Sequence, residues 1–316
     1  MVAGLQRSGT SWIGKMLEAS GEAVYVNEPM NPKHPPGRSP GVLNVDVDSR
    51  FQYICADNED RFVAAFRDTL RLRYHVIAEL RRNHGAYDLA RMAKYWTSFT
   101  AGRLRRRRAL IRDPCSTFSA MWLARRMGCA VVISVRHPLS FVGSWRRLGW
   151  RVNLYDVLDQ PLLMRDLLGP YEDELRAMAG SDDQVAKAAL LWRVTYDLLG
   201  DLDARQPGLL HIKRYEDLAS DPEAGFRDLY AICGLSWTER ARKQIEWATT
   251  EQGKPERLYT WILRGGVSRT AFRPMDSRSS LGAFRSRLSE QDIEKVREIT
   301  GTVAARYYNA KDGVSF

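Results

Sequence analysis

The sequence predicts an α/β fold in which a central parallel β-sheet is flanked by helices. Strand-like and helix-like segments alternate along the 316 residues, and this alternation favours parallel strands joined by helical crossovers. The segment 129–138 (CAVVISVRHP) is nearly all apolar until its end, as expected for a strand buried on both faces. Three predicted strands end in polar turns, QRSGTS, RDP and RHP, and ligands of such sheets bind beyond the carboxyl ends of the strands.

The first half of the chain supplies three of the predicted strands. A short apolar run at 2–5 leads into a helical pattern at 10–19, and a second strand is predicted at 22–26. Five prolines then mark residues 27–41 as a loop over the surface or over a site. Helices are predicted from about 59 to 104, with a break near 83–85, before the strand ALIRDP.

The second half continues the alternation and closes with a capped helix. Helices are predicted at 117–128, ended by a glycine, and at 139–148, behind a proline in the first turn. The remaining predicted elements are a long helix at 183–202, a strand and helical turn at 208–218, helices at 221–235 and 237–250, an aperiodic stretch at 252–287, and a serine-capped helix at 289–301. Because the sequence has no internal repeat and no low-complexity linker, we interpret residues 1–316 as a single domain.

Charge limits the classes of partner. The formal net charge is +10 and the pI is about 9.5, which fits nucleic acid, an anionic membrane face or a highly anionic small molecule. The densest basic cluster runs from Arg103 to Arg108. It lies between a helical segment and a strand, where a solvated helix end is the commoner explanation than a nucleic-acid site.

Composition and cysteine usage indicate an ordinary reduced globular protein. The sequence is 44% hydrophobic and has no run of about 18 apolar residues, so we expect no membrane span. Its start shows no basic n-region or cleavage site. The four cysteines lie far apart without C-x-x-C spacing, which disfavours a disulfide scaffold and a thiolate metal site. These features predict a cytoplasmic protein.

Residues 4–11 (GLQRSGTS) have the G-x-x-x-x-G spacing of a nucleotide phosphate loop. The loop follows the first predicted strand and opens a helix, so backbone N–H groups and the positive helix end can surround an anion. Arg7 offers a planar fork to phosphate oxygens. The candidate anion-binding residues here are Arg7, Ser8, Gly9, Thr10 and Ser11.

The loop lacks the lysine of ATP- and GTP-dependent phosphoryl-transfer enzymes. Thr10 stands at the lysine position, and Lys15 falls about one helical turn too far along the chain to replace it. That lysine reaches the β- and γ-phosphates of a triphosphate. Its absence, together with Arg7, suggests a nucleotide that ends in something other than a triphosphate.

Two segments resemble the sulfotransferases that use 3′-phosphoadenosine 5′-phosphosulfate (PAPS). RSGTSW, at residues 7–12, resembles the 5′-phosphosulfate loop of that family. VVISVRHPLSFVGSW, at 131–145, resembles its 3′-phosphate element, in which an arginine ends a strand and a serine follows eight residues later. Here these are Arg136 and Ser144. The resemblance implies a P-loop-like sulfotransferase architecture, PAPS as donor and 3′-phosphoadenosine 5′-phosphate (PAP) as product.

Further segments extend the resemblance with decreasing fidelity. HIKRYEDLASDP resembles a strand and turn whose tyrosine lies near the nucleotide, which implies Tyr215. The resemblance also implies that Trp12 stacks on adenine, although a core tryptophan is the competing interpretation. SRSSLGAFRSRLS resembles a late segment that closes over the 3′-phosphate and implies Arg278. Phe284 replaces the family's tryptophan there and Ser279 its first glycine, so the alternatives Arg269, Arg273 and Arg285 stay open.

The resemblance implies two possible positions for the general base. One is a histidine in a lysine-x-histidine turn, but this chain has Arg112-Asp113-Pro114 there. The other is a glutamate just after the second strand, as in tyrosylprotein and carbohydrate-type members, and VNEP places Glu28 at that spacing. We predict Glu28 as general base, with His34 and then Asp113 as alternatives. A capping or salt-bridged carboxylate is the competing interpretation of Glu28.

Arg7 and Arg112 are predicted to stabilise the sulfuryl oxygens and the leaving phosphate. Because no His, Cys and carboxylate residues have metal-ligand spacing, we predict chemistry without a metal. The acceptor is expected to be a small molecule, a glycoside or a lipid, and Trp96, Trp145, Trp150 and Trp261 suggest a partly apolar one. A homodimer stays open. The competing functions are a P-loop nucleotide kinase or NTPase, and a non-catalytic basic protein that binds anions or nucleic acid.

Overall fold

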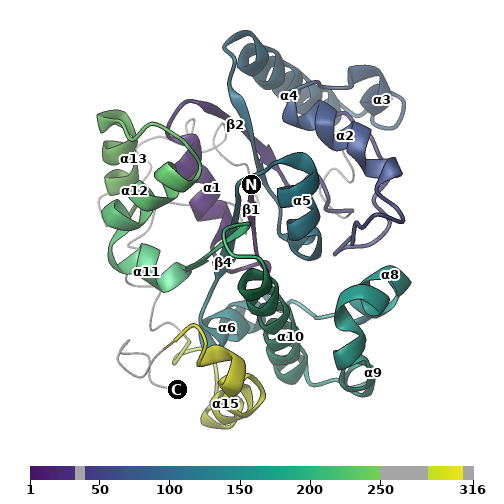
Figure 1. The fold of residues 1–316 in the computed structure, drawn as a ribbon, viewed down its shortest axis with the longest axis vertical. Helices are drawn as coiled ribbons and strands as arrows, with labels where there is room; N and C mark the ends of the chain where they lie inside the picture. Colours follow the sequence, from purple (N-terminus) through teal and green to yellow (C-terminus); the bar gives the residue numbers. More distant parts are fainter. Residues whose placement is uncertain (33–39, 250–283, 309–316) are drawn as a thin grey trace.

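One five-stranded parallel β-sheet lies at the centre of the computed structural model, which describes residues 1–32, 40–249 and 284–308 (Figure 1). The strand order is β2-β3-β1-β4-β5. The strands are β1 (Val2–Ala3), β2 (Ala23–Asn27), β3 (Arg108–Arg112), β4 (Val131–Val135) and β5 (Leu210–Arg214). All neighbouring strands are parallel, which confirms the predicted α/β fold with flanking helices.

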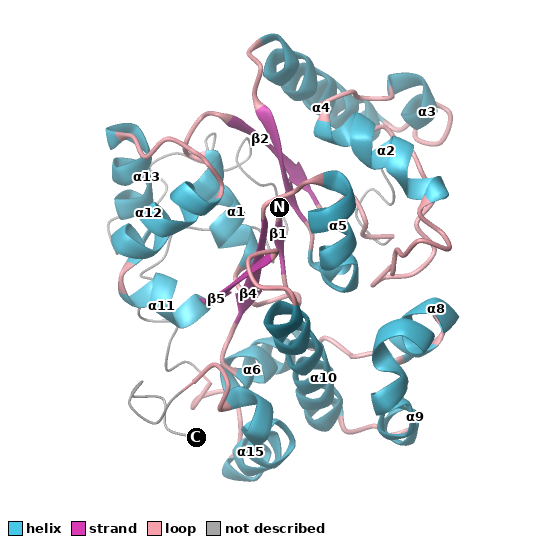
Figure 2. Ribbon diagram, viewed as in Figure 1, coloured by secondary structure: helices cyan, strands magenta, loops and turns pink. Residues whose placement is uncertain are grey.

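Helices cover both faces of the sheet (Figure 2). One face carries α1 (Thr10–Glu18), α11 (Tyr215–Ser220), α12 (Pro222–Ile232) and α13 (Glu239–Thr249). The other face carries α2 (Asp60–Leu70), α5 (Ala120–Met127), α6 (Pro138–Leu148), α10 (Gln184–Arg205) and α15 (Glu290–Ala304). Two further helices, α3 (Val76–Leu80) and α4 (Ala86–Leu104), lie beyond β2 at one extremity of the molecule.

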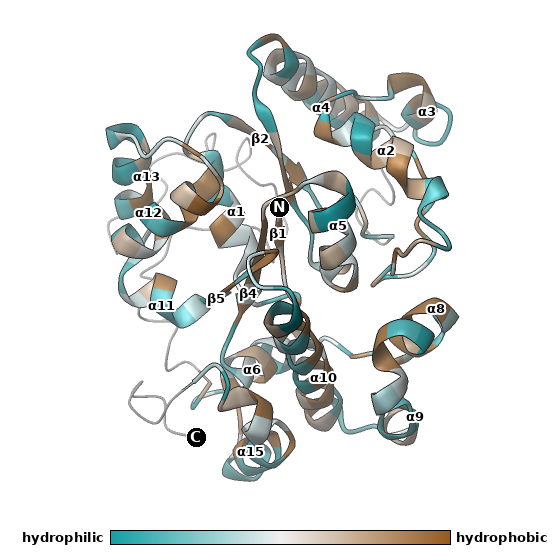
Figure 3. Ribbon diagram, viewed as in Figure 1, coloured by the Kyte–Doolittle hydropathy of each residue, from teal (hydrophilic) through white to brown (hydrophobic). Residues whose placement is uncertain are grey.

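Successive side chains of a strand pack alternately into the two hydrophobic cores on opposite faces of the sheet. In β4, Val132 packs into the core with α1 and α12, whereas Val131 and Ile133 pack into the core with α5 and α10. All five residues of β4 are buried, and the central strands are coloured hydrophobic in Figure 3. This period of two is the geometry of a strand covered on both sides, and it explains why the β4 segment reads as an unbroken apolar run.

Several predicted helix ends have the expected stereochemistry. Ser289 forms a capping box with Asp292 at the start of α15, and Asp183 accepts two backbone N–H bonds at the start of α10. Gly128 ends α5 in the left-handed conformation with φ of 64°. The predicted ends at Ser289 and Gly128 are therefore confirmed, and the cap by Asp183 is an addition from the structure.

Two stretches differ from expectation. The first strand ends at Ala3 rather than residue 5, because Gly4 turns the chain with φ of 117°. Residues 155–179, for which no elements were predicted, form short helical pieces. These are α7 (Tyr155–Leu158), α8 (Pro161–Leu163), a π-helical turn (Met164–Leu168), a 3₁₀ turn (Gly169–Tyr171) and α9 (Glu172–Ala179). Among the described residues, no helix combines the length and apolar character needed to cross a membrane.

Candidate active site

The loop after β1 has a backbone that demands glycine at two positions. Gly4 has φ of 117°, and a Cβ there would lie 2.4 Å from the carbonyl oxygen of Ser134 on β4. Gly9 has φ of 95°, and a Cβ there would lie 2.4 Å from the ring of Tyr215. Arg7, between them, also has a positive φ of 80°. Because only glycine adopts such conformations without strain, the G-x-x-x-x-G spacing is explained by the fold itself.

A buried tyrosine of α10 holds the loop from beneath. The hydroxyl of Tyr196 accepts from the backbone N–H of Leu5 (3.3 Å), bonds the hydroxyl of Ser8 (2.8 Å) and donates to the carbonyl of Ser134 (2.8 Å). Ser8 is fully buried and its N–H donates to Leu5. In this structure Ser8 therefore shapes the loop, and its predicted contact with phosphate stays a prediction. Tyr196 was not among the sequence-predicted residues.

The structure brings the two predicted phosphate elements together. The side-chain Nε of Arg7 donates to Oγ of Ser144 on α6 (3.0 Å), and Arg136 donates to the carbonyl oxygen of Arg7 (3.1 Å). Arg136 leaves the end of β4, and it is only 8% exposed. Its Nε–H is buried without a hydrogen-bond partner among the described residues. An unsatisfied buried donor of this kind is costly unless a ligand meets it.

Positive charge accumulates around Arg7. The pKa of Arg7 is lowered to about 10, by burial first and then by the charges of Arg136, Arg147, Arg112 and Arg287. The pKa of Arg287 is also lowered, by burial and by Arg147 and Arg136. Mutual destabilisation of cations marks a place where an anion is stabilised. Arg147 and Arg287 were missed from sequence, because only the fold places them beside the loop.

Tyr215 packs between the two phosphate elements. Its ring lies against Gly9 and under the Arg136 guanidinium, 4.5 Å from ring centroid to Cζ. Trp12 is 7% exposed and contacts Tyr215 and Phe226 edge to face, with centroids 5.3 and 5.1 Å apart. These contacts belong to the core beneath α1. The predicted adenine stacking by Trp12 stays a prediction.

A second constellation lies at the ends of β2 and β3. The guanidinium of Arg112 donates to the carboxylate of Glu28 and to the hydroxyls of Ser11 and Thr10, the last at 3.2 Å. Burial alone would lower the pKa of Arg112, but Tyr25, Glu28 and Asp113 raise it above its ordinary value. Arg112 thereby connects the predicted base to the phosphate loop.

The backbone of Glu28 is unusual for a glutamate, with φ of 46°. Its N–H donates to the carbonyl of Arg112 (2.8 Å), which extends the β2–β3 pairing by one residue. The Nδ2 of Asn31 donates to Oε2 of Glu28 (2.6 Å), and the carboxylate side chain is 17% exposed. The carboxylate is thus fixed and still reaches the surface of the site. Strained backbone held by its surroundings is common at functional positions.

Asp113, the third-ranked base candidate, has a structural position. It is completely buried, and its carboxylate accepts the backbone N–H groups of Met30 and Cys115. Burial and the nearby charge of Glu28 raise the pKa of Asp113 to about 7. Both carboxylate oxygens therefore fasten the turns that follow β2 and β3.

Some predicted residues lie outside the described residues. These are His34, Trp261, Arg269, Arg273, Arg278 and Ser279. The described end of the late segment does return to the site, because Phe284 and Arg287 pack against Gly143, next to Ser144. Lys15 pairs with Glu18 (2.7 Å) and lies over the ring of Tyr25. This agrees with its exclusion as the missing loop lysine.

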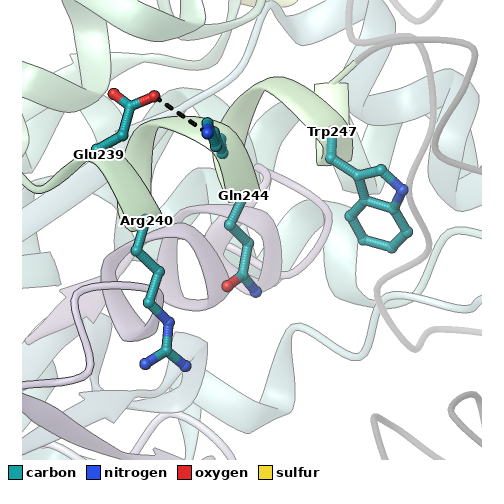
Figure 4. Close-up of a pocket in the computed structure, with 5 residues that line it drawn as sticks. Glu239, Arg240, Gln244 and Trp247 are labelled. Carbon is teal, nitrogen blue, oxygen red and sulfur yellow. Dashed lines mark ion pairs between the residues drawn. The ribbon is translucent and has the colours of Figure 1, made fainter.

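A separate hollow lies on α13 (Figure 4). Its lining residues are Glu239, Arg240, Lys243, Gln244 and Trp247. Figure 4 shows the ion pair between Glu239 and Lys243, whose atoms are 3.7 Å apart. We assign this hollow no chemistry. Over residues 1–32, 40–249 and 284–308, no three His, Cys, Asp or Glu side chains are grouped to hold a metal ion.

Comparison with known proteins matches the chain to one family. A family model described as "Sulfotransferase family" matches residues 1–239. Three solved structures are similar: the sulfotransferase domain from the curacin biosynthetic pathway (14% identity, 96% of each chain, TM-score 0.47), that from the Synechococcus PCC 7002 olefin synthase (15%, 98% of this chain and 94% of the other, 0.47) and sulfotransferase STF9 from Mycobacterium avium (14%, 97% and 76%, 0.42). No curated protein sequence matches.

Proposed function

We propose, from the premise that the chain belongs to the sulfotransferase family, that it moves a sulfuryl group from PAPS to a hydroxyl. The observation that carries this proposal is the convergence of Arg7, Arg136 and Ser144 in one positively charged place, with the pKa of Arg7 lowered to about 10. Because arginine side chains in this site repel one another, the site favours a ligand with several negative charges. PAPS and PAP are such ligands.

The hydrogen-bond directions fit an adenosine ligand charged at both ends. Arginine has no acceptor, so Arg7 must donate to Ser144, and the hydroxyl proton of Ser144 is left to be donated elsewhere. We assign that proton and the unpaired Nε–H of Arg136 to the 3′-phosphate. When bound, PAPS would supply the activated sulfuryl group on its 5′-phosphate.

The same logic assigns donors to the 5′ end. Arg112 donates to the hydroxyls of Thr10 and Ser11, so both hydroxyl protons are left to be donated to the 5′-phosphosulfate. Thr10 begins α1, whose positive end adds to their effect. Arg7 and Arg112 would stabilise the charge that grows on the bridging oxygen.

We assign Glu28 as the general base that takes the proton of the acceptor hydroxyl. Arg112 and Asn31 each bond one of its carboxylate oxygens. These two bonds hold the carboxylate in one orientation, as a general base aimed at one proton requires. The position next to the phosphate loop brings base and sulfuryl group to one edge of the sheet, as an in-line transfer needs.

The acceptor class is proposed as a small molecule, a glycoside or a lipid. Near the loop, the ring of Trp150 lies 6.0 Å from the Arg7 guanidinium and packs edge to face on Trp145. Trp145 is buried, Trp150 is half-buried and Trp96 is 53% exposed. Trp150 is therefore the tryptophan best placed to contact an acceptor. Cytoplasmic location and a homodimer stay predictions from the sequence.

Thermal stabilisation by nucleotides tests the donor. At about 100 times its dissociation constant, PAP should add about 2.7 kcal/mol to the free energy of unfolding, whereas ATP with Mg²⁺ and duplex DNA should add little. Incubation with PAPS and an acceptor library should then give products heavier by one sulfuryl group. Stabilisation by ATP with Mg²⁺ and none by PAP would support a P-loop kinase or NTPase instead.

A further inference from the structure

We infer that the outward face of α3 and α4 docks this protein onto an anionic lipid bilayer. We call this face the α3–α4 surface and define it by its exposed apolar side chains and by the arginines at the end of α4. Its apolar members are Ile77, Leu80, Leu89, Trp96 and Leu104, and its arginines are Arg103, Arg105 and Arg106. Figure 1 shows both helices at one extremity of the molecule, where a flat surface can reach them.

One stripe along most of α4 is uncharged, and the exposed residues Lys94 and Arg103 lie beside it. The inward side buries Met92, Phe99 and Gly102. The uncharged stripe follows the helical repeat and consists of Leu89, Ala93, Trp96, Thr100 and Leu104. Trp96 is 53% exposed and Leu104 is 81% exposed. A solvated helix normally turns charges to water, so this apolar stripe favours a partner.

Positive charge surrounds the stripe. Residues 71–107 contain ten Arg and Lys residues and two acidic ones, a net charge of +8, whereas the whole chain has +10. Both acidic residues, Glu79 and Asp88, are ion-paired with Arg91. Two of the arginines, Arg73 and Arg82, pair with Asp68 and Asp46 outside the segment, so the positive charge is concentrated at the end of α4. An apolar face bordered by Lys and Arg, with tryptophan and leucine exposed, is typical of interfacial membrane helices.

These arginines cannot serve the nucleotide. β3 begins at Arg108, next to the basic end of α4, and ends at Arg112 in the candidate active site. Four steps of strand separate those two residues, roughly 13 Å at about 3.3 Å per residue. The basic end of α4 therefore lies at the opposite end of the strands from the candidate active site. Sulfuryl transfer does not explain the arginines there.

The combination of charge and apolar area selects the bilayer over two other occupants. A second copy would bring the same +8 segment against itself, and like charges oppose that contact. Duplex DNA would use the arginines but would gain nothing from exposed Trp96 and Leu104. Only an anionic bilayer offers phosphate groups and apolar chains side by side. The inference is independent of the proposed sulfuryl transfer.

Vesicle sedimentation of the whole protein tests the inference. Vesicles of phosphatidylcholine with about 30% phosphatidylserine should pull the protein down, and pure phosphatidylcholine vesicles should not. Raising the salt from about 0.1 to about 0.5 M should weaken the binding, because screening shortens the reach of charge. Binding to duplex DNA is measured in parallel.

Two variants with matched controls separate charge from apolar contact. Arg103→Gln, Arg105→Gln and Arg106→Gln together should weaken partitioning about 100-fold, at about fivefold for each arginine. The control replaces three exposed arginines elsewhere with glutamine, namely Arg125, Arg205 and Arg240. Trp96→Ser with Leu104→Ser should weaken vesicle binding about tenfold or more, whereas Tyr155→Ser on α7, also exposed, should not.

Several outcomes would overturn the inference. These are no binding to the anionic vesicles at low salt, equal binding to neutral vesicles, or equal loss in the control with three other arginines replaced. Tight binding to DNA that the serine variants leave unchanged, without vesicle binding, would identify the surface as a nucleic-acid site. Circular dichroism of each variant confirms that the fold is intact, and PAP binding should be the same in all of them.

Discussion

The candidate site lies at the carboxyl ends of the strands, and its two halves use arginine in opposite ways. At the ends of β1 and β4, Arg7 and Arg136 have no ion pair with an acidic residue among the described residues, and burial together with the charge of Arg136 lowers the pKa of Arg7. At the ends of β2 and β3, Arg112 is paired with Glu28, and its pKa is raised. The arginines of the first half therefore suit the binding of an anionic ligand. The second half already contains its anion and uses arginine to position it.

This difference teaches how one residue type can bind a ligand or orient a catalyst. An arginine that is not paired with a carboxylate can form strong charge-assisted hydrogen bonds with a phosphate group of a ligand. An arginine paired with a buried carboxylate fixes that carboxylate in place, and its removal would leave the carboxylate charge uncompensated. The hydroxyls of Thr10 and Ser11 lie between the two halves and join them, since both accept from Arg112. The predictions below test each half separately.

The largest effect is expected for the base. Glu28→Gln should lower turnover by roughly 10²- to 10⁴-fold, because the amide cannot take the acceptor proton. PAP affinity should stay near normal, since the phosphate donors are untouched. Steady-state kinetics and calorimetric PAP binding measure the two quantities. Glu223→Gln, at an exposed site on α12, is the control and should change neither; turnover of Glu28→Gln equal to that of the control would remove the residue from this role.

Replacing an arginine in each half should change a different property: the affinity for PAP in the first half and the melting temperature in the second. Arg7→Gln should weaken PAP binding by roughly 10- to 100-fold, the range for a hydrogen bond to a charged group, without lowering the melting temperature. Arg112→Gln should lower the melting temperature, because it leaves the carboxylate of Glu28 without its main partner. Differential scanning calorimetry with and without PAP compares them. Equal melting temperatures for the two variants would contradict the distinction between the halves.

The support beneath the loop should matter less than either half. Tyr196→Phe removes the hydroxyl that bonds Leu5, Ser8 and Ser134, and should cost about 1–3 kcal/mol of unfolding free energy. It should also weaken PAP binding, because the loop loses its anchor. Tyr230→Phe is the control: its buried hydroxyl donates to the carbonyl of Met16 (2.7 Å), far from Arg7. If both variants bind PAP normally, Tyr196 has only a structural role.

The last prediction concerns the pH dependence of stability, not PAP binding or turnover. The pKa of Asp113 is raised to about 7 in the folded protein, above its ordinary value near 3.9. Its contribution to stability is therefore fully present below about pH 4 and is lost as the pH rises through about 7. Asp113→Asn does not titrate, so the stability advantage of the natural protein over this variant should shrink between pH 5 and 8. An advantage that grows over that range would show that the pKa is not raised.

Much of the fold could be predicted because its strands are short apolar runs between glycine, proline and polar turns. Such runs identify β2 and β4 directly, whereas residues 155–179 carry helical pieces of three to eight residues. A helical period cannot be recognised over one turn. The strand order could not be predicted either, because the apolar pattern of a strand does not determine which strands pair with it.

The site was predictable where spacing along the chain carries the geometry. Arg136 and Ser144 are eight residues apart across one strand end and one helix, so the sequence itself places them together. Arg287 and Tyr196 reach the loop only through the packing of distant elements. The one available signal for Tyr196 is a tyrosine within an apolar stretch of a long helix, where a buried hydroxyl needs a partner. That signal does not say which partner.

The central claim is that both phosphate elements bind one ligand, Arg136 and Ser144 at its 3′-phosphate and Arg7 at its 5′ end. The direct test is the ratio of dissociation constants for adenosine 5′-monophosphate and PAP, which differ only by the 3′-phosphate. The natural protein and Arg7→Gln should both prefer PAP by roughly 10- to 100-fold. In Arg136→Gln the preference should collapse toward unity. A preference for PAP that survives Arg136→Gln unchanged would contradict the account.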